Sequence, residues 1–226
     1  MRRITLTFDN GPDPDTTPRV LDFLAHHDIL ATFFALGSKA VIERNAALLA
    51  RAHQAGHWVG NHTWSHSTPL GELDEALALA ELNRTHEALF SLGLTEKLFR
   101  PFGRAGNIGT HLLNPAAVNW LKTHEYSCVL WNCVPGDWWD PEGWMERGIA
   151  QCQTRDWSLV VLHDLPTGAM KHLGEFILQL KQRGFMFVQA FPPDCVPIAQ
   201  GQIVMPLDGI VALRTGQSSP TPFPSP

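Results

Sequence analysis

The feature that most constrains the fold is a regular alternation of short apolar segments with segments of helical periodicity. Apolar runs of strand length occur at residues 4–8, 31–36, 57–60, 98–99, 126–131, 158–163 and 185–191. Helical patterns lie between them, at residues 18–27, 39–55, 74–92, from 114, from 140 and at 176–183. Such alternation predicts parallel strands joined by helices. We therefore expect an α/β protein, built either as an open doubly wound sheet or as a (β/α) barrel of fewer than eight units.

Capping residues mark where the expected helices begin and end. Start signals occur at Thr17–Pro18, Asn114–Pro115 and Asp140–Pro141, and glycine stops helices at positions 56, 93 and 184. We expect residues 1–195 to form the barrel or sheet. Residues 196–226 are expected to be an irregular C-terminal extension, rich in Pro and Ser at its end.

The composition argues against several classes of function. The chain has 226 residues, of which 44% are hydrophobic and 17% charged, and this is enough to bury the core of one large domain. Lys and Arg number 17 against 22 Asp and Glu, a formal net charge of −5, so nucleic acid is not an expected partner. No apolar run reaches the roughly 18 residues that span a membrane, and a strand stands where a secretory signal would lie. We expect a cytoplasmic protein with no membrane partner.

The four cysteines lack the C-x-x-C spacing of many metal and redox sites, and they are too few for a disulfide scaffold in a chain of this size. They are Cys128, Cys133, Cys152 and Cys195. We expect buried free thiols.

Polar and charged side chains gather where the expected strands end. Asp9 and Asn10 follow the first strand, and NHTWSH follows the third. The stretches RPFG, PGDWW and HD stand at the ends of the fourth, fifth and sixth strands; these three clusters supply Arg100, Asp137, His163 and Asp164. Both candidate architectures place their functional residues at the C-terminal ends of strands. The five clusters are therefore expected at one rim.

Position along the chain, and not spacing, distinguishes two histidine pairs. His62 and His66 stand four residues apart at the rim, and His53 and His57 have the same spacing. However, His53 lies near the end of an expected helix and His57 directly follows Gly56. We interpret this second pair as surface residues.

Each rim residue also has a structural interpretation. Taken alone, Asp9 and Asn10 are typical of a turn or helix cap, and a histidine pair is typical of surface or core positions. Arg100 could be a buried ion-pair partner of Asp9, and the tryptophans are at least as typical of core packing as of ligand stacking. Asp164 is interpreted as structural.

Five stretches resemble, in order and approximate spacing, the five motifs of the polysaccharide deacetylase family, carbohydrate esterase family 4. They are TFDNGPDPDTTPRVLDFL, NHTWSH, FRPFG, WNCVPGDW and LVVLHD, and the match runs from about Thr5 to about Phe191. The resemblance implies a distorted, TIM-barrel-like (β/α)7-type barrel of about seven strands. It also implies a divalent metal, usually zinc, and hydrolysis of an N-acetyl amide on a sugar.

The resemblance assigns the metal and the base to residues of this chain. Amide hydrolysis needs a nucleophilic water, a charge that stabilises the oxyanion and a proton for the departing amine. His62 and His66 align with metal ligands, and as neutral imidazoles they could converge on one ion. Asp9 aligns with the general base, and Arg100 with the arginine that pairs with it and keeps it ionised.

The acid and the walls of the site are implied in the same way. His163 aligns with the general acid, and Asp137 with the carboxylate that orients this histidine and raises its pKa. A backbone N–H near Phe102 would face the oxyanion. Trp138 and Trp64, with Trp139 close by, could line the site and stack on a sugar ring.

The chain departs from the family pattern at three points. Asn10 stands where most members have a metal-binding aspartate, and an amide oxygen brings no charge. Metal affinity should therefore be lower, and the bound ion a stronger Lewis acid. The stretch RPFG is one residue shorter than the common form, and Val134 replaces an acid often found three residues before Asp137.

The main hypothesis is a metal-dependent deacetylase that acts on an N-acetylated sugar, oligosaccharide or related small amide. The first alternative is a metal-independent hydrolase of a small cyclic amide, similar to the allantoinase-like relatives of this family. The second is a barrel that binds a glycan or metabolite without turning it over. Asn10 is the sequence feature that separates the three hypotheses, because the loss of an acidic metal ligand would weaken a metal-dependent enzyme and would be no handicap to a metal-independent one.

Overall fold

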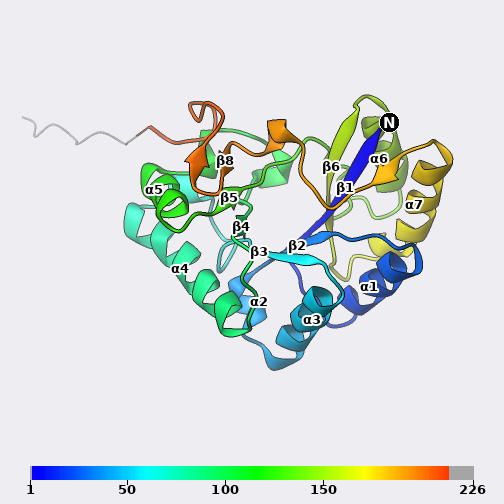
Figure 1. Cartoon of the computed structure of the whole chain (residues 1–226), viewed down its shortest axis with the longest axis horizontal. Coiled ribbons are helices and arrows are strands. Elements are labelled where there is room, and N and C mark those ends of the chain that lie inside the picture. The colour runs from blue at the N-terminus through cyan, green and yellow to red at the C-terminus, as the bar shows by residue number, and fades with distance from the viewer. Residues whose placement is uncertain (1, 214–226) are drawn as a thin grey trace, which may run out of the picture.

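A curled sheet with helices around its outer side forms the framework of the protein in the computed structural model, which describes residues 2–213 (Figure 1). Within these residues the strands are β1 (Arg3–Asp9), β2 (Thr32–Ala35), β3 (Trp58–Asn61), β4 (Leu98–Phe99), β5 (Ser127–Cys128), β6 (Trp157–His163), β7 (Met186–Phe187), β8 (Ile198–Ala199) and β9 (Gln202–Ile203). Their order is β6-β1-β2-β3-β4-β5-β8-β9, and β7 pairs with the start of β1. β1 to β7 pair in parallel, whereas β8 and β9 pair antiparallel.

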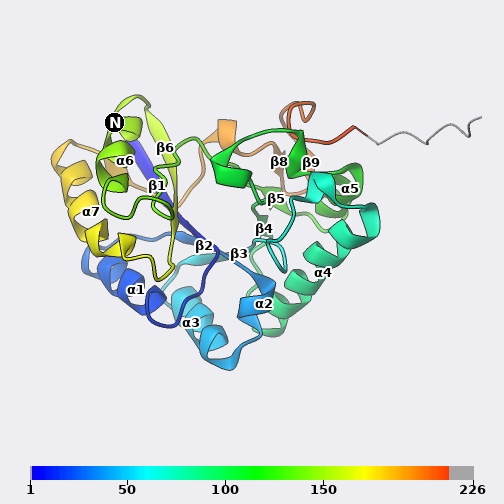
Figure 2. The same ribbon diagram turned by 180° about the vertical axis from the view of Figure 1, so that it is seen from behind.

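The helices follow the strands in the expected alternation (Figure 2). They are α1 (Thr17–His26), α2 (Gly37–Ala40), α3 (Glu43–Gln54), α4 (Glu75–Ser91), α5 (Pro115–Thr123), α6 (Trp144–Gln153) and α7 (Leu173–Gln182). Short 3-10 helices lie at Leu70–Glu72, Arg104–Gly106, Thr110–Leu112, Ala169–His172 and Pro193–Cys195. In both views the helices lie around the convex side of the sheet.

The strand order identifies a barrel and excludes the open doubly wound sheet. The first five strands are neighbours in chain order, and β6 returns to lie beside β1 along its full length, from Arg3 opposite Trp157 to Asp9 opposite His163. The seam between β5 and β6 is closed only by one isolated parallel bridge in the described residues, Cys133 with Val160. The expected (β/α) barrel is therefore confirmed, in the form of a curled half-barrel with one weak seam.

Burial explains why these segments form strands. All of β1 after Arg3 is buried, as is all of β2, because both faces of a parallel sheet are covered. One core cluster packs between the sheet and the outer helices and includes Phe8, Leu24, Trp144 and Phe176. A second cluster includes Phe34, Phe99 and Leu159. The side chain of Arg100 is as fully buried as these.

Several predicted helix boundaries are confirmed. Asn114 caps α5 by accepting a hydrogen bond from the Ala117 N–H at 2.8 Å. Gly56, Gly93 and Gly184 follow α3, α4 and α7 with φ of 90°, 77° and 77°, left-handed values at which glycine avoids the strain of a side chain.

Other predicted boundaries are wrong. The helix expected at residues 39–55 is two helices, because Ile42 has extended backbone between α2 and α3. The helix expected from Asp140 begins at Trp144, after a turn in which Asp140 Oδ1 accepts from the Gly143 N–H at 3.0 Å. Thr17 is already the first residue of α1 and does not cap it.

The strands at residues 126–131 and 185–191 are shorter than expected, and the C-terminal extension is not wholly irregular. Residues 198–203 form a β8–β9 hairpin, and β8 extends the sheet by pairing with β5, Ile198 opposite Cys128. The prediction of irregular structure from residue 196 is therefore wrong for this hairpin. The Pro- and Ser-rich end lies outside the described residues.

The four cysteines are free and buried, as expected. None of the helices in the described residues combines the length and the apolar character needed to cross a bilayer.

Candidate active site

A cavity of about 150 Å³ opens at the C-terminal ends of β1, β3, β4 and β6. It is lined by Asp9, Asn10, His62, His66, Pro101, Phe102, Gly103, Ala105, Gly106, Trp131, Val134, Trp138, Val161 and His163. Because parallel strands point the same way, residues that follow strands distant in sequence meet at this rim. Residues from all five expected clusters line this one hollow, although Arg100 itself is not among them.

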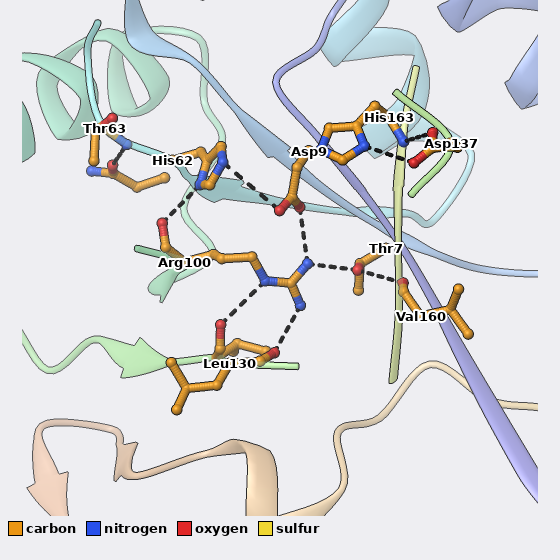
Figure 3. A network of polar contacts seen from close by, with 11 residues as sticks. Thr7, Asp9, His62, Thr63, Arg100, Leu130, Asp137, Val160 and His163 are labelled. Atoms are coloured by element: carbon orange, nitrogen blue, oxygen red, sulfur yellow. Dashed lines mark hydrogen bonds and ion pairs between the residues drawn. The ribbon is translucent and has the colours of Figure 1, made fainter. Parts of the chain in front are cut away.

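A buried ion pair joins Arg100 to Asp9, which lines the cavity (Figure 3). Arg100 Nη1 donates to Asp9 Oδ1 at 2.9 Å and to Thr7 Oγ1 at 2.6 Å. The other two nitrogens of this guanidinium donate to backbone oxygens, Nε to that of Val129 at 3.2 Å and Nη2 to that of Leu130 at 3.1 Å. With its side chain wholly buried, Arg100 has its charge neutralised by Asp9 and its donors directed at fixed acceptors. The second oxygen of Asp9, Oδ2, is left outside this network.

His62 is held as one defined tautomer. Its Nδ1 lies 2.8 Å from the backbone oxygen of Arg100. A carbonyl oxygen can only accept, so Nδ1 carries the proton and Nε2 keeps a free lone pair. Burial lowers the pKa of His62 to about 3, so the ring is neutral near pH 7. Its Nε2 is 3.7 Å from Asp9 Oδ2, a contact between two acceptors and not an ion pair at that pH.

His66 is the second neutral imidazole. Burial, followed by the nearby His62, lowers the pKa of His66 to about 3. The two histidine rings have centroids 4.8 Å apart, and the ring of His66 packs at 3.8 Å from that of Phe102. A neutral imidazole is the form that binds a metal ion.

Asn10 completes a donor set that fits a divalent cation. Its backbone is in the left-handed region with φ of 68°, which asparagine tolerates, and Lys39 Nζ donates to its carbonyl oxygen at 2.7 Å. Its side-chain Oδ1 is buried and has no hydrogen-bond partner. Two imidazoles and one unpartnered amide oxygen in the lining of one cavity could supply three neutral ligands to a cation. Among the described residues no group of three or more His, Cys, Asp and Glu gathers in this way, so the fit depends on the amide.

Asp137 contacts His163 through both of its carboxylate oxygens. Its Nδ1 lies 2.9 Å from Asp137 Oδ1, and its backbone N–H donates to Oδ2 at 2.8 Å. Burial alone would lower the pKa of His163, but the hydrogen bond and charge of Asp137, with Asp9 and Asp164, raise it above its ordinary value. Trp138 packs edge-on against this ring with centroids 5.0 Å apart.

Not every predicted wall residue lines the cavity. Phe102 and Trp138 do, but Trp64 does not, because its ring lies under the guanidinium of Arg84 at 3.9 Å and packs against Gly37. Trp139 also lies outside the lining and is 62% exposed. The sequence interpretation missed Trp131, which lines the cavity and donates from Nε1 to the Gly106 oxygen at 2.8 Å. The sequence did offer one indication of this role, because Trp131 is the last residue of an expected strand.

Of the second histidine pair, His53 and His57, only His53 lies at the surface as predicted. His53 is exposed and contacts Glu96 at 2.9 Å. His57, in contrast, is buried, and its Nδ1 accepts from the Ala31 N–H at 3.1 Å. The prediction of a surface position for His57 is wrong, because the residue directly precedes β3 and packs edge-on against Phe33.

Asp164 is structural in its contacts, as interpreted. It is fully buried, accepts from Thr17 Oγ1 at 2.5 Å and packs so closely on Gly11 that a side chain at that glycine would collide with its carboxylate. Burial raises the pKa of Asp164 to about 7. It supports the turn that carries Asn10 and does not line the cavity.

Comparison with known proteins gives consistent matches. The family model described as polysaccharide deacetylase matches residues 1–118. The peptidoglycan-N-acetylglucosamine deacetylase of Bacillus cereus is 33% identical over 193 residues, which cover 82% of this chain and 84% of that protein. The chain spans smaller shares of other curated relatives, 66% of a second Bacillus cereus deacetylase and 38% of PgdA from Listeria monocytogenes.

Two solved structures are similar throughout most of the chain. Peptidoglycan deacetylase PdaC from Bacillus subtilis has a TM-score of 0.68 at 31% identity, over 83% of this chain and 87% of that one. A family 4 acetyl xylan esterase from Clostridium thermocellum, in complex with a cobalt ion, has a TM-score of 0.68 at 30% identity over the same shares.

Proposed function

The chain belongs to the polysaccharide deacetylase family, and we propose that it removes the N-acetyl group of an amino sugar by metal-dependent hydrolysis. One observation carries the proposal: Asp9 and His163, register partners on β1 and β6, line one cavity with two neutral imidazoles. Hydrolysis of an amide needs a base for the water, an acid for the amine and positive charge near the oxyanion. The cavity contains a candidate base and a candidate acid, and its two imidazoles could hold the cation that supplies the charge.

We propose zinc as the cation, held by His62 Nε2, one ring nitrogen of His66 and Asn10 Oδ1. When bound, a divalent cation supplies Lewis acidity and lowers the pKa of a bound water. The cobalt ion of the acetyl xylan esterase supports a divalent site in this fold. Because all three ligands are neutral, affinity should be lower than with an aspartate at position 10.

Asp9 is proposed as the general base. Arg100 occupies Oδ1, so Oδ2 is the oxygen available to take a proton from the attacking water. The buried guanidinium holds this carboxylate in place by a charge-assisted hydrogen bond of 2.9 Å. Thr7 and two backbone oxygens hold the guanidinium, so the pair is preorganised before substrate binds.

His163 is proposed as the general acid. Asp137 holds Nδ1, and Nε2 is therefore the nitrogen that would deliver a proton to the departing amine. The raised pKa of His163 supports this role, because an acid must be protonated near the working pH. The backbone N–H of Phe102 is proposed to donate to the oxyanion.

The proposed substrate is a small N-acetylated saccharide. A cavity of about 150 Å³ with Trp131 and Trp138 in its wall suits an acetamido group and part of one sugar ring. The deacetylase names of the relatives support an N-acetylated glycan. The cytoplasmic location stays a prediction, which localisation of the tagged full chain would test.

Asn10 also favours a second candidate, a metal-independent hydrolase of a small cyclic amide. A neutral residue at position 10 would be no handicap to an enzyme that needs no cation. A barrel that binds its ligand without turnover is the third possibility.

The test is elemental analysis of protein purified without added metal, followed by acetate release from N-acetylglucosamine oligomers with and without a chelator. We expect bound metal and a chelator-sensitive activity that Asp9→Asn lowers by roughly two or more orders of magnitude. Chelator-resistant opening of a cyclic amide would favour the second candidate. A ligand-induced rise in melting temperature without turnover would favour the third.

A further inference from the structure

The loop between the two candidate metal ligands has a shape that its own sequence does not favour. β3 ends at Asn61, and within the next five residues Thr63 and His66 have φ of 68° and 55°. Both values are left-handed; a β-branched residue such as Thr63 is strained there, whereas histidine occurs in this region more often than most residues. Such backbone persists only when the surroundings fix it. The direction of the His66 ring therefore depends on contacts from outside the loop.

One carboxylate from a distant helix supplies such contacts. Glu81 of α4 accepts through Oε2 from the backbone N–H groups of Trp64, at 2.9 Å, and of Ser65, at 2.8 Å. Its Oε1 accepts from Ser65 Oγ at 2.8 Å. The Ser65 hydroxyl in turn accepts from the Ser67 N–H at 3.3 Å. The chain of contacts from Glu81 thus reaches both sides of His66.

The position of Glu81 is itself fixed by the packing of α4. The helix is capped by Asp74, whose side chain accepts from the Leu77 N–H at 2.8 Å. Asn61 Nδ2 at the end of β3 donates to the Leu82 oxygen at 3.1 Å, and Arg84 covers the Trp64 ring. The carboxylate is therefore placed by a helix that contacts the loop at neighbouring residues.

We propose that Glu81 is a positioning residue that sets the geometry of His62 and His66 toward one divalent cation. The inference rests on the proposed function, because it presupposes that these histidines bind the ion. Residues that orient metal ligands from outside the coordination sphere affect affinity by roughly 10–100-fold when replaced. Glu81 acts on backbone groups between the ligands and contacts neither imidazole.

The substitutions Glu81→Ala and Glu81→Gln separate this role from general support of the fold. Alanine removes all three contacts, whereas glutamine keeps one acceptor oxygen for the two N–H groups and can donate to Ser65 Oγ. Glu87→Gln is the matched control, because Glu87 lies on the same helix and is exposed. We expect the order of cobalt affinity to be wild type and Glu87→Gln, then Glu81→Gln, then Glu81→Ala.

The measurement is titration of the metal-free full chain with Co²⁺, followed by visible absorption, with the melting temperature of each metal-free variant recorded in parallel. We expect Glu81→Ala to weaken Co²⁺ binding by roughly 10-fold or more and to change the absorption bands. A role confined to folding would lower the melting temperature while leaving affinity and bands unchanged, and that result would overturn the inference.

Two further outcomes are decisive. If the wild-type chain binds no Co²⁺, the metal-dependent function fails and the role of Glu81 falls with it. If the wild type binds Co²⁺ and all variants bind it equally, only the role of Glu81 is refuted. Should Glu81→Ala fail to fold, Ser65→Ala removes the hydroxyl contact from the loop side, and its spectrum together with that of Glu81→Gln gives the same decision.

Discussion

Replacing Asp137 with asparagine tests the acid proposed for the reaction. The carboxylate holds His163 by two hydrogen bonds, 2.9 Å to Nδ1 and 2.8 Å to the backbone N–H, and both side chains are buried. Asparagine has nearly the same shape and can still accept from the backbone N–H. Its amide cannot supply the negative charge that favours the protonated imidazole.

The expected size follows from that charge. A hydrogen bond to a charged group contributes about 1.5–3 kcal/mol, and 1.36 kcal/mol corresponds to about one pKa unit. Asp137→Asn should therefore lower the pKa of His163 by about 1–2 units. The proposed acid works when protonated, so the alkaline limb of the pH profile should move to lower pH by the same amount. Turnover at neutral pH should fall by roughly 10–100-fold, because that share of the protonated imidazole is lost when the pKa drops by this amount.

Two measurements check this expectation. The pH dependence of acetate release reports the active acid, and NMR titration of the His163 ring reports its pKa without any substrate.

The raised pKa also links His163 to stability. Its contribution to the free energy of unfolding is fully present below the unfolded pKa and is lost as pH rises through the folded pKa. An unchanged ring pKa together with an unchanged alkaline limb would refute the assignment of Asp137 and His163.

Three other expectations follow from the buried polar groups. Asn10→Asp should tighten metal binding with activity kept or raised, and unchanged metal affinity in a chelator competition would show that position 10 does not face the ion. Arg100→Met leaves the Asp9 carboxylate buried without its partner and should lower the free energy of unfolding by about 3–5 kcal/mol in urea denaturation; a loss under about 1 kcal/mol would contradict the buried ion pair. Burial lowers the pKa of His57 to about 4, so the unfolded chain binds the extra proton first and stability falls as pH drops from 6.5 toward 4. His57→Asn, which can still accept from Ala31, should reduce that acid loss by up to about 3 kcal/mol, while His62 and His66 go on contributing; an equally steep loss in the variant would disprove the link to His57.

The sequence predicted those parts of the fold that depend on local patterns. Parallel strands are buried on both faces, so continuous apolar runs mark them, and glycine marks helix ends wherever φ is positive. The break at Ile42 could not be predicted in this way. The start of α2 is attached to the loop after β3, where the N–H groups of Gly37 and Ser38 donate to the Thr63 and Trp64 oxygens, and no local pattern reveals such contacts. The β8–β9 hairpin likewise depends on a free edge at β5 that no local pattern reveals.

The site was predictable to the extent that strand ends converge. Asp9, His62 and His163 could be assigned to one rim because each follows a strand, and the family resemblance supplied their roles. Trp131 and Glu81 were missed because their contacts, with Gly106 and with residues 64–65, join segments about 16 to 25 positions apart with no shared periodicity. His57 was misassigned because a glycine before it is typical of a turn and says nothing about what covers the following strand.

Arg100 influences the cavity by two routes that respond differently to substitution. Its guanidinium reaches Asp9, whereas its main-chain oxygen determines which nitrogen of His62 carries the hydrogen. A change of side chain can abolish the first effect but leaves the second in place, since every amino acid brings the same carbonyl group. The charge beside Asp9 can therefore be altered by mutation while the free lone pair of His62 persists, and only a displacement of β4 itself would disturb both together.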